Sequence, residues 1–217
     1  MSARPRKVSD EDVFAAVLRV MTRLSPAQVT LAEIAAEAGV TSSALVQRFG
    51  SKRELLLSVT GLAAEGTGEF FSGLRAAHAS PLAALHAYAA CFAEMAETPE
   101  TLAHHLGYLQ MDLTDPDFRR HARDQARVAD RAIRGLLEEA VDAGELVRGT
   151  DVGALMRAVI AVLGGSLLAW AVRQKGTAVN WMREDLDAVL RPHALEPSRF
   201  ATRIRGAKRT RGAPGKR

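Results

Sequence analysis

Residues 30–52, TLAEIAAEAGVTSSALVQRFGSK, contain two short helical stretches on either side of a Gly-Val-Thr corner at residues 39–41. A helix of about two turns is unstable in isolation, so neighbouring helices must hold both stretches in place. Glycine ends a helix readily because it takes the left-handed conformation without strain, and threonine can cap the start of the next one. The segment therefore predicts two helices, residues 31–38 and 42–49, that meet at a tight turn.

The second of these helices has two different faces. At about 100° per residue, Leu45 and Phe49 point together toward the protein. Ser43, Val46 and Gln47 project from the opposite side, where a second apolar stripe is missing. Buried anchors on one side and short polar groups on the other are what a helix needs to enter a DNA groove.

The residue types also suit the reading of base edges. Gln47 can pair with adenine through two hydrogen bonds, serine can address several bases, and Val46 can contact a thymine methyl group. Thr30 and Lys52 lie in the first turns of their helices, where phosphates bind well. The candidate DNA-binding residues are Thr30, Thr41, Ser42, Ser43, Val46, Gln47, Arg48 and Lys52. The alternative interpretation is that these polar groups are merely solvated.

The run TLAEIAAEAGVTSSALVQRFGSKREL resembles the helix-turn-helix of the TetR (tetracycline repressor) family. One position departs from the family pattern, because Val46 replaces a tyrosine that commonly reaches a phosphate. This position is therefore expected to shift toward base contact. The residues that carry the resemblance are Thr30, Ile34, Ala35, Ala38, Gly39, Val40, Thr41, Leu45, Phe49, Ser51, Lys52 and Leu55.

The resemblance implies an all-α bacterial transcriptional regulator that works as a homodimer on a palindromic operator. Its two reading helices would lie about one DNA turn apart, ~34–36 Å. Such a protein is most often a repressor released by a small-molecule effector. The alternative is a DNA-binding activator or architectural protein with no effector. A cytoplasmic location is expected, and no cofactor.

Helical periodicity and capping signals extend along the rest of the chain and predict about nine helices. We expect a helix-turn-helix domain over residues 1–56, a helical effector-binding and dimerisation domain over 57–198, and a basic, disordered tail over 199–217. The expected helices are roughly 10–24, 31–38, 42–49, 52–76, 81–96, 99–112, 116–143, 151–174 and 181–190, with bounds good to ~2–4 residues.

Composition excludes several classes of protein. With 47% hydrophobic and 25% charged residues the chain is not mainly disordered, and its single cysteine excludes a disulfide framework. There is no P-loop, Rossmann glycine pattern, G-x-S-x-G or HExxH, so an enzyme is not expected. His104, His105, His121 and Asp112 do not predict a metal site, because adjacent histidines point about 100° apart on a helix.

Both ends of the chain are basic. Residues 199–217 hold eight basic groups and no acid, and residues 1–56 hold eight basic and six acidic groups. Arg4, Arg6 and Lys7 are expected to reach a minor groove, and the tail could add phosphate contacts that weaken with salt. The alternative is a solvated tail that aids solubility.

An effector site is expected in the fourth to eighth helices, where apolar walls carry a few polar tips. The same pattern also describes an ordinary core. The candidate ligand-binding residues, which share faces of two neighbouring helices, are Tyr88, Cys91, Phe92, Met95, His104, Tyr108 and Met111.

A dimer interface is expected on the last two helices. Residues 158–172 are apolar nearly all round, more than one core requires, yet their 15 residues fall short of the roughly 20 that span a bilayer. The alternative is a monomer's central helix. The candidate interface residues are Val159, Leu163, Gly164, Leu167, Trp170, Trp181, Leu186 and Leu190.

The fourth helix carries four glycines, at positions 61, 66, 68 and 73, which cost it ~3–4 kcal/mol against alanine. We hypothesise that it is a bistable connection between the DNA-binding and effector-binding parts. The alternative is a loosely packed or broken helix without a part in signalling.

Overall fold

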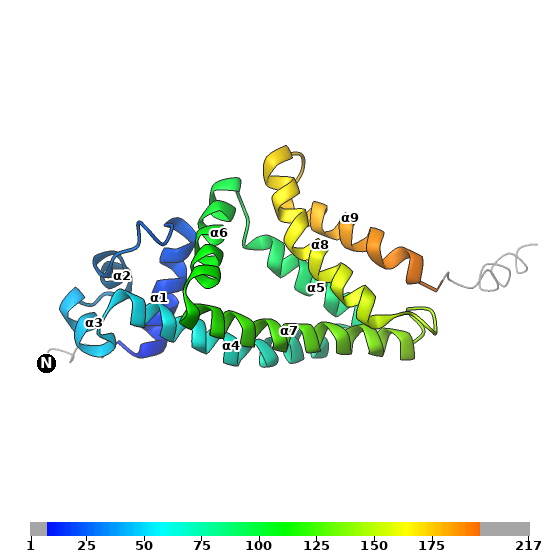
Figure 1. Cartoon of the computed structure of the whole chain (residues 1–217), viewed down its shortest axis with the longest axis horizontal. Helices are drawn as coiled ribbons and strands as arrows, with labels where there is room; N and C mark the ends of the chain where they lie inside the picture. Colours follow the sequence, from blue (N-terminus) through cyan, green and yellow to red (C-terminus); the bar gives the residue numbers. More distant parts are fainter. Residues whose placement is uncertain (1–7, 196–217) are drawn as a thin grey trace, which may run out of the picture.

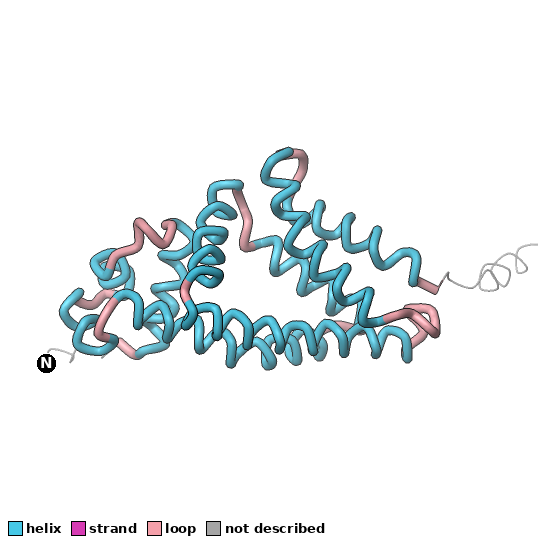
Figure 2. The backbone as a smooth tube through the Cα atoms, in the orientation of Figure 1, coloured by secondary structure: helices cyan, strands magenta, loops and turns pink. Residues whose placement is uncertain are grey.

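The computed structural model describes residues 8–195. Within that range it has nine α-helices, one 3-10 turn and no strand apart from an isolated bridge between Leu146 and Ala194 (Figures 1 and 2). The predicted all-α fold is thereby confirmed. The helices are α1 (Asp10–Arg23), α2 (Leu31–Ala38), α3 (Ser42–Phe49), α4 (Lys52–Ala77), α5 (Pro81–Glu94), α6 (Pro99–Thr114), α7 (Pro116–Asp142), α8 (Val152–Arg173) and α9 (Ala178–Leu190).

Local capping explains where the helices begin. The Thr41 hydroxyl accepts from the backbone N–H of Ala44 at 3.2 Å to start α3, and Gly39 ends α2 with a φ of 69°. Helix α9 begins three residues earlier than predicted, because Thr177 caps it by accepting from Asn180 N at 3.2 Å. The predicted contacts of Arg4, Arg6 and Lys7 and the predicted basic tail lie outside the described residues.

The described chain has two hydrophobic cores. The first gathers α1, α2 and α3 around fully buried Val17, Ile34 and Leu45, and it also takes in Tyr108 from α6 and Phe118 from α7. The second lies among α5, α7, α8 and α9. The first core therefore extends beyond residue 56, and the two parts of the molecule share the packing at their junction.

Helices α4 and α7 lie side by side along the length of the molecule (Figure 1). Helix α4 is continuous through all four glycines. A Cβ at Gly61 would lie 3.3 Å from His121 Cε1 on α7, so glycine permits a close approach there. Packing against α7 thus holds a helix that its own glycines weaken.

Helix α8 is buried on one face and exposed on the other. It is the one described helix that is long and apolar enough to cross a membrane. Its most apolar 18-residue stretch has a mean hydropathy of 1.9, and 28% of that stretch is buried in the protein. Core helices meet the same length and composition criteria. The expected burial in the protein therefore applies to one side of α8 alone.

This two-sided burial divides the predicted dimer-interface residues into two groups. Six of its candidates are at most 6% exposed and belong to the protomer's own core: Val159, Leu163, Leu167, Trp170, Leu186 and Leu190. They face inward because their side of α8 packs on α9. Gly164 is exposed and Trp181 is half-buried. Besides Gly164, the exposed apolar residues of α8 include five that were not predicted: Ile160, Ala161, Gly165, Leu168 and Val172.

Candidate nucleic-acid interface and ligand cavity

Helix α3 is anchored by the two residues that its periodicity assigned to the inside. Leu45 is fully buried in the first core, and half-buried Phe49 packs against it with its ring centroid 5.7 Å from that of Phe14. The first core, in which these two anchors pack, also contains side chains from α1, α2, α4, α6 and α7. A short helix is thereby held in one orientation.

The opposite face of α3 is open to solvent. Ser43 and Gln47 are exposed, and the Val46 side chain is 47% exposed. The Ser43 hydroxyl lies 3.0 Å from that of Thr41, and within the described chain the Gln47 amide has no hydrogen-bond partner. Ser42 is half-buried at the start of the helix. This surface therefore offers the Gln47 amide, together with the hydrogen-bonding capacity of Ser43 that its contact with Thr41 does not use.

Arg48 is turned away from that surface. Its guanidinium donates to the Val8 carbonyl at 3.0 Å, pairs with the Asp10 carboxylate and lies 5.3 Å from the centroid of the Phe49 ring. These contacts tie α3 to the start of α1. Arg48, one of the predicted DNA-binding residues, thus has partners inside the protein.

Lys52 is also engaged. Its ammonium donates to the carbonyls of Pro26 at 3.2 Å and Val29 at 2.8 Å, and so braces the loop between α1 and α2. An ammonium has three donors, so one remains for a phosphate. Thr30 accepts from Glu33 N at 3.1 Å as the cap of α2, which leaves its hydroxyl hydrogen available.

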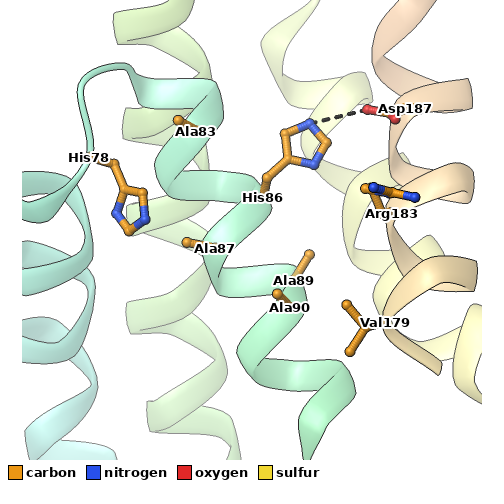
Figure 3. A pocket seen from close by; sticks show the side chains of 9 residues that line it. All are labelled: His78, Ala83, His86, Ala87, Ala89, Ala90, Val179, Arg183 and Asp187. Carbon is orange, nitrogen blue, oxygen red and sulfur yellow. Dashed lines mark ion pairs between the residues drawn. The ribbon is translucent and has the colours of Figure 1, made fainter. Parts of the chain in front are cut away.

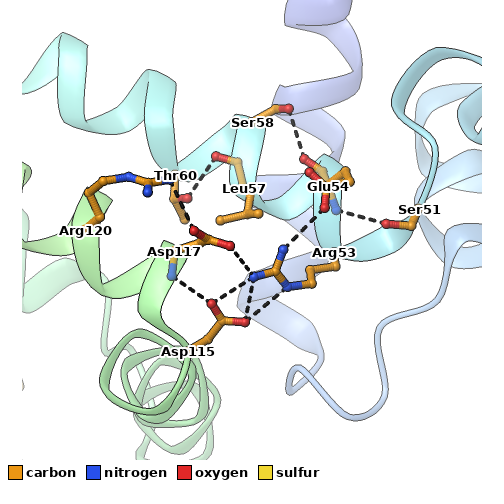
Figure 4. Close-up of polar contacts among 9 residues, drawn as sticks. All are labelled: Ser51, Arg53, Glu54, Leu57, Ser58, Thr60, Asp115, Asp117 and Arg120. Atoms are coloured by element: carbon orange, nitrogen blue, oxygen red, sulfur yellow. Dashed lines mark hydrogen bonds and ion pairs between the residues drawn. The ribbon is translucent and has the colours of Figure 1, made fainter.

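Arg53 forms an ion-pair network that joins α4 to the start of α7 and that the sequence interpretation missed (Figure 4). Its guanidinium lies 2.9 Å from Asp115 and 2.7 Å from Asp117, and 5.7 Å from the Phe118 ring centroid. Hydrogen bonds from Arg53 hold the pKa of Asp117 below its usual value. Burial acts to raise the pKa of Asp115, but hydrogen bonds from the Asp117 backbone and Arg53 outweigh it and lower that pKa. The network therefore stays charged at neutral pH.

Three ligand candidates on α6 lie at the junction with the first core rather than in a cavity. Tyr108 donates its hydroxyl to the Leu24 carbonyl at 3.0 Å, and burial raises its pKa to about 12. His104 Nδ1 lies 3.4 Å from the Thr22 carbonyl, and Met111 packs on the first core. Helix α6 is thus joined to the end of α1.

The other four ligand candidates line a cavity of about 810 Å³ among α4, α5, α7 and α8. Tyr88, Phe92, Met95 and exposed Cys91 form its α5 wall. Phe70 and Phe71 from α4 join them, with 4.5 Å between the ring centroids of Phe71 and Tyr88. The sequence placed the site in the fourth to eighth helices but did not identify the lining residues of α4, α7 and α8, because these faces come together only through helix packing.

A second hollow, of about 480 Å³, lies between α5 and α9 (Figure 3). Alanines of α5 make up much of its wall, and His86 Nε2 lies 3.3 Å from Asp187 Oδ1 across it. Within residues 8–195 no group of three or more His, Cys, Asp or Glu side chains is arranged to hold a metal ion.

The geometry defines a helix-turn-helix protein. Its short α3 is anchored in the first core, and its larger cavity lies among α4, α5, α7 and α8. Comparison with known proteins agrees. Residues 14–59 match the family model described as bacterial regulatory proteins, tetR family. No curated protein matches the sequence at a significant level.

Solved structures match over most of the chain. A TetR transcription regulator from Haloarcula marismortui has a TM-score of 0.70 at 14% identity, covering 86% of this chain and 98% of its own. FadR from Bacillus subtilis in complex with stearoyl-CoA has a TM-score of 0.62 at 19% identity, and the match covers 83% of this chain and 97% of FadR. SmeT, the repressor of the Stenotrophomonas maltophilia efflux pump SmeDEF, has a TM-score of 0.62 at 21% identity, and the match covers 88% of this chain and 93% of SmeT.

The predicted resemblance to the TetR family is therefore confirmed. Residues 14–59 match the family's own model, and the described chain has the fold of TetR-family transcriptional regulators.

Proposed function

We propose that this protein is a cytoplasmic transcriptional repressor that binds a palindromic operator as a homodimer. A hydrophobic or aromatic small molecule releases it from the operator. The observation that carries the proposal is the outer face of α3. Ser43, Val46 and Gln47 are exposed there on a helix that Leu45 and Phe49 hold rigidly. Base reading in a major groove requires exposed hydrogen-bonding groups on a helix that is held in one orientation.

Two further features support the regulatory part of the proposal. The cavity of about 810 Å³ falls within the usual size of small-molecule sites and is lined by aromatic rings. Structures of similar fold are described as complexes with stearoyl-CoA and with triclosan. The exposed apolar face of α8 supports a homodimer, because monomers rarely expose a continuous apolar patch of this kind.

The test of DNA reading begins with selection of bound duplexes from a random pool, which should return a palindrome. Gln47→Ala should then weaken binding to that palindrome by about 1–3 kcal/mol, because a bidentate base contact is lost. Binding to unrelated duplex should change little, since phosphates supply it. Gln110→Ala, at an exposed glutamine on α6, is the matched control. Equal operator affinity of the Gln47 variant and the control would contradict the proposal.

A further inference from the structure

The cavity among α4, α5, α7 and α8 is lined by an acidic side chain but by no basic one among the described residues. Of the described residues that line it, Asp130 is the one ionisable group other than Tyr88 and Cys91, and no lysine, arginine or histidine lines it. Asp130 lies on α7, is half-buried, and has no hydrogen-bond or ion-pair partner among the described residues. The nearby Arg127 of the same helix is paired with Asp124 at 3.1 Å. Arg134, one turn further along α7, forms no ion pair with Asp130 either, so the wall presents a carboxylate that is not paired with a described cation.

The aromatic rings line the same cavity as this carboxylate. Burial raises the pKa of Tyr88, and the negative charge of Asp130 raises it further. The Tyr88 ring centroid lies 4.5 Å from that of Phe71 and 6.3 Å from those of Phe70 and Phe92. Four aromatic rings and one acid therefore share one cavity.

Such a lining has a definite preference among ligands. A cation is attracted both by a carboxylate and by aromatic faces, which carry negative potential. A carboxylate or phosphate on the ligand would meet Asp130 with no positive side chain in the described wall to receive it. An uncharged apolar ligand would gain from burial alone and would leave Asp130 without a partner.

We propose that the ligand of this cavity is a hydrophobic molecule with a single cationic group, and that Asp130 receives that group while the aromatic rings hold the apolar body. The inference deepens the proposed function by naming the chemical class of the effector, and it rests on that function only for the claim that binding alters DNA affinity. The charge preference itself can be measured without DNA.

Three probes that share the same apolar 6-phenylhexyl chain distinguish the effect of ligand charge from that of hydrophobic burial. They end in trimethylammonium, in an alcohol and in a carboxylate. Calorimetric titration of the full chain should rank them in that order. The ammonium probe should bind at least about tenfold more tightly than the alcohol, since the carboxylate and the ring faces both act on its charge. Equal affinities, a preference for the carboxylate, or no binding of any probe would overturn the proposal.

Asp130→Asn keeps the size of the side chain and removes its charge. It should weaken binding of the ammonium probe about tenfold and leave the alcohol unchanged. Asp142→Asn, at an exposed acid on the same helix that lies outside the cavity lining and makes no ion pair with a described residue, is the matched control and should change neither. An Asp130 variant that keeps the full preference for the ammonium probe would overturn the assignment of this residue.

The single cysteine supplies an independent readout of where the probe binds. Cys91 is exposed and lines the cavity, so the ammonium probe should slow its alkylation by iodoacetamide. Unchanged alkylation at saturating probe would place the ligand elsewhere and overturn the site. If instead the probe binds, protects Cys91 and leaves operator affinity unchanged, the charge preference stands and the effector role in the proposed function fails.

Discussion

Two basic residues near α3, Arg48 and Lys52, make hydrogen bonds within the protein that their position in the sequence does not reveal. Arg48 and Lys52 carry positive charge beside the reading helix, yet both donate to backbone carbonyls of the protein itself. Ser43 and Gln47, which are uncharged, remain available on the surface. Specificity at this surface is therefore expected to come from neutral hydrogen-bonding groups rather than from cations.

Lys52→Met should test the bracing role of the ammonium. Methionine keeps much of the apolar stem but removes the donors to Pro26 and Val29, so the free energy of unfolding should fall by about 1–3 kcal/mol. Amide exchange in residues 25–29 should quicken in parallel. Denaturant unfolding and hydrogen exchange measure both effects. Lys175→Met, at an exposed lysine beyond the end of α8, should change neither. Wild-type stability of the Lys52 variant would show that the two carbonyls do not depend on it.

At the scale of elements, α4 is the helix that joins the two cores. It begins next to α3, runs along α7 and supplies Gly66, Thr67, Phe70 and Phe71 to the cavity wall. Its glycines are not all alike. Gly61 accommodates His121, whereas a Cβ at Gly66 or Gly73 would meet nothing within 4 Å. The alternative of a broken helix does not apply to this structure, and the signalling hypothesis for α4 remains a prediction.

Replacing Gly66 and Gly68 by alanine tests that hypothesis. Each change should stabilise the helix by up to about 1 kcal/mol, because alanine has the higher helix propensity and a Cβ at Gly68 would make ordinary contact, 3.8 Å from Val128 Cγ1. If α4 bends in the response, the stiffened variant should need a different effector concentration to leave the operator. Binding curves with and without effector measure this. Gly73→Ala stiffens the same helix outside the cavity lining and should respond as wild type. An unchanged response of the double variant would rule out bending at these glycines.

The whole molecule is organised around the junction of its two cores. Phe118 from α7 and Tyr108 from α6 are buried in the first core, and Arg53 holds the start of α7 through Asp115 and Asp117. A Cβ at Gly107 would lie 2.9 Å from Pro26 Cδ, so α6 and the loop before α2 are in close contact. A rearrangement around the cavity could reach α3 along both α4 and α6.

Self-association should depend on the exposed face of α8. Leu168 is 47% exposed and Val172 is 84% exposed, so a charge at Leu168 need not disturb the fold of one protomer. Leu168→Glu should convert a dimer into monomers at micromolar concentration, because burial of a charge opposes association. Sedimentation velocity measures the change. Leu113→Glu, at a 61% exposed leucine on α6, is the control. A Leu168 variant as dimeric as the control would place the interface elsewhere.

The sequence by itself determined the helices and the inward side of α3. Capping residues and proline act within four positions of a helix start, and periodicity relates residues one turn apart, so both can be read from neighbours in the chain. This is why the bounds of α2 and α3 matched and why Leu45 and Phe49 were assigned to the inside. The start of α9 was missed where the Thr177 cap was overlooked.

Tertiary structure alone decided which partners the remaining side chains have. Helix α8 is apolar all round, so its periodicity could not distinguish the face that packs on α9 from the face that stays exposed. Arg53 meets Asp115 and Asp117 more than sixty positions away, and the cavity joins Asp130 to rings from α4 and α5. Such contacts depend on how helices pack against one another, and no local pattern of residues encodes that packing.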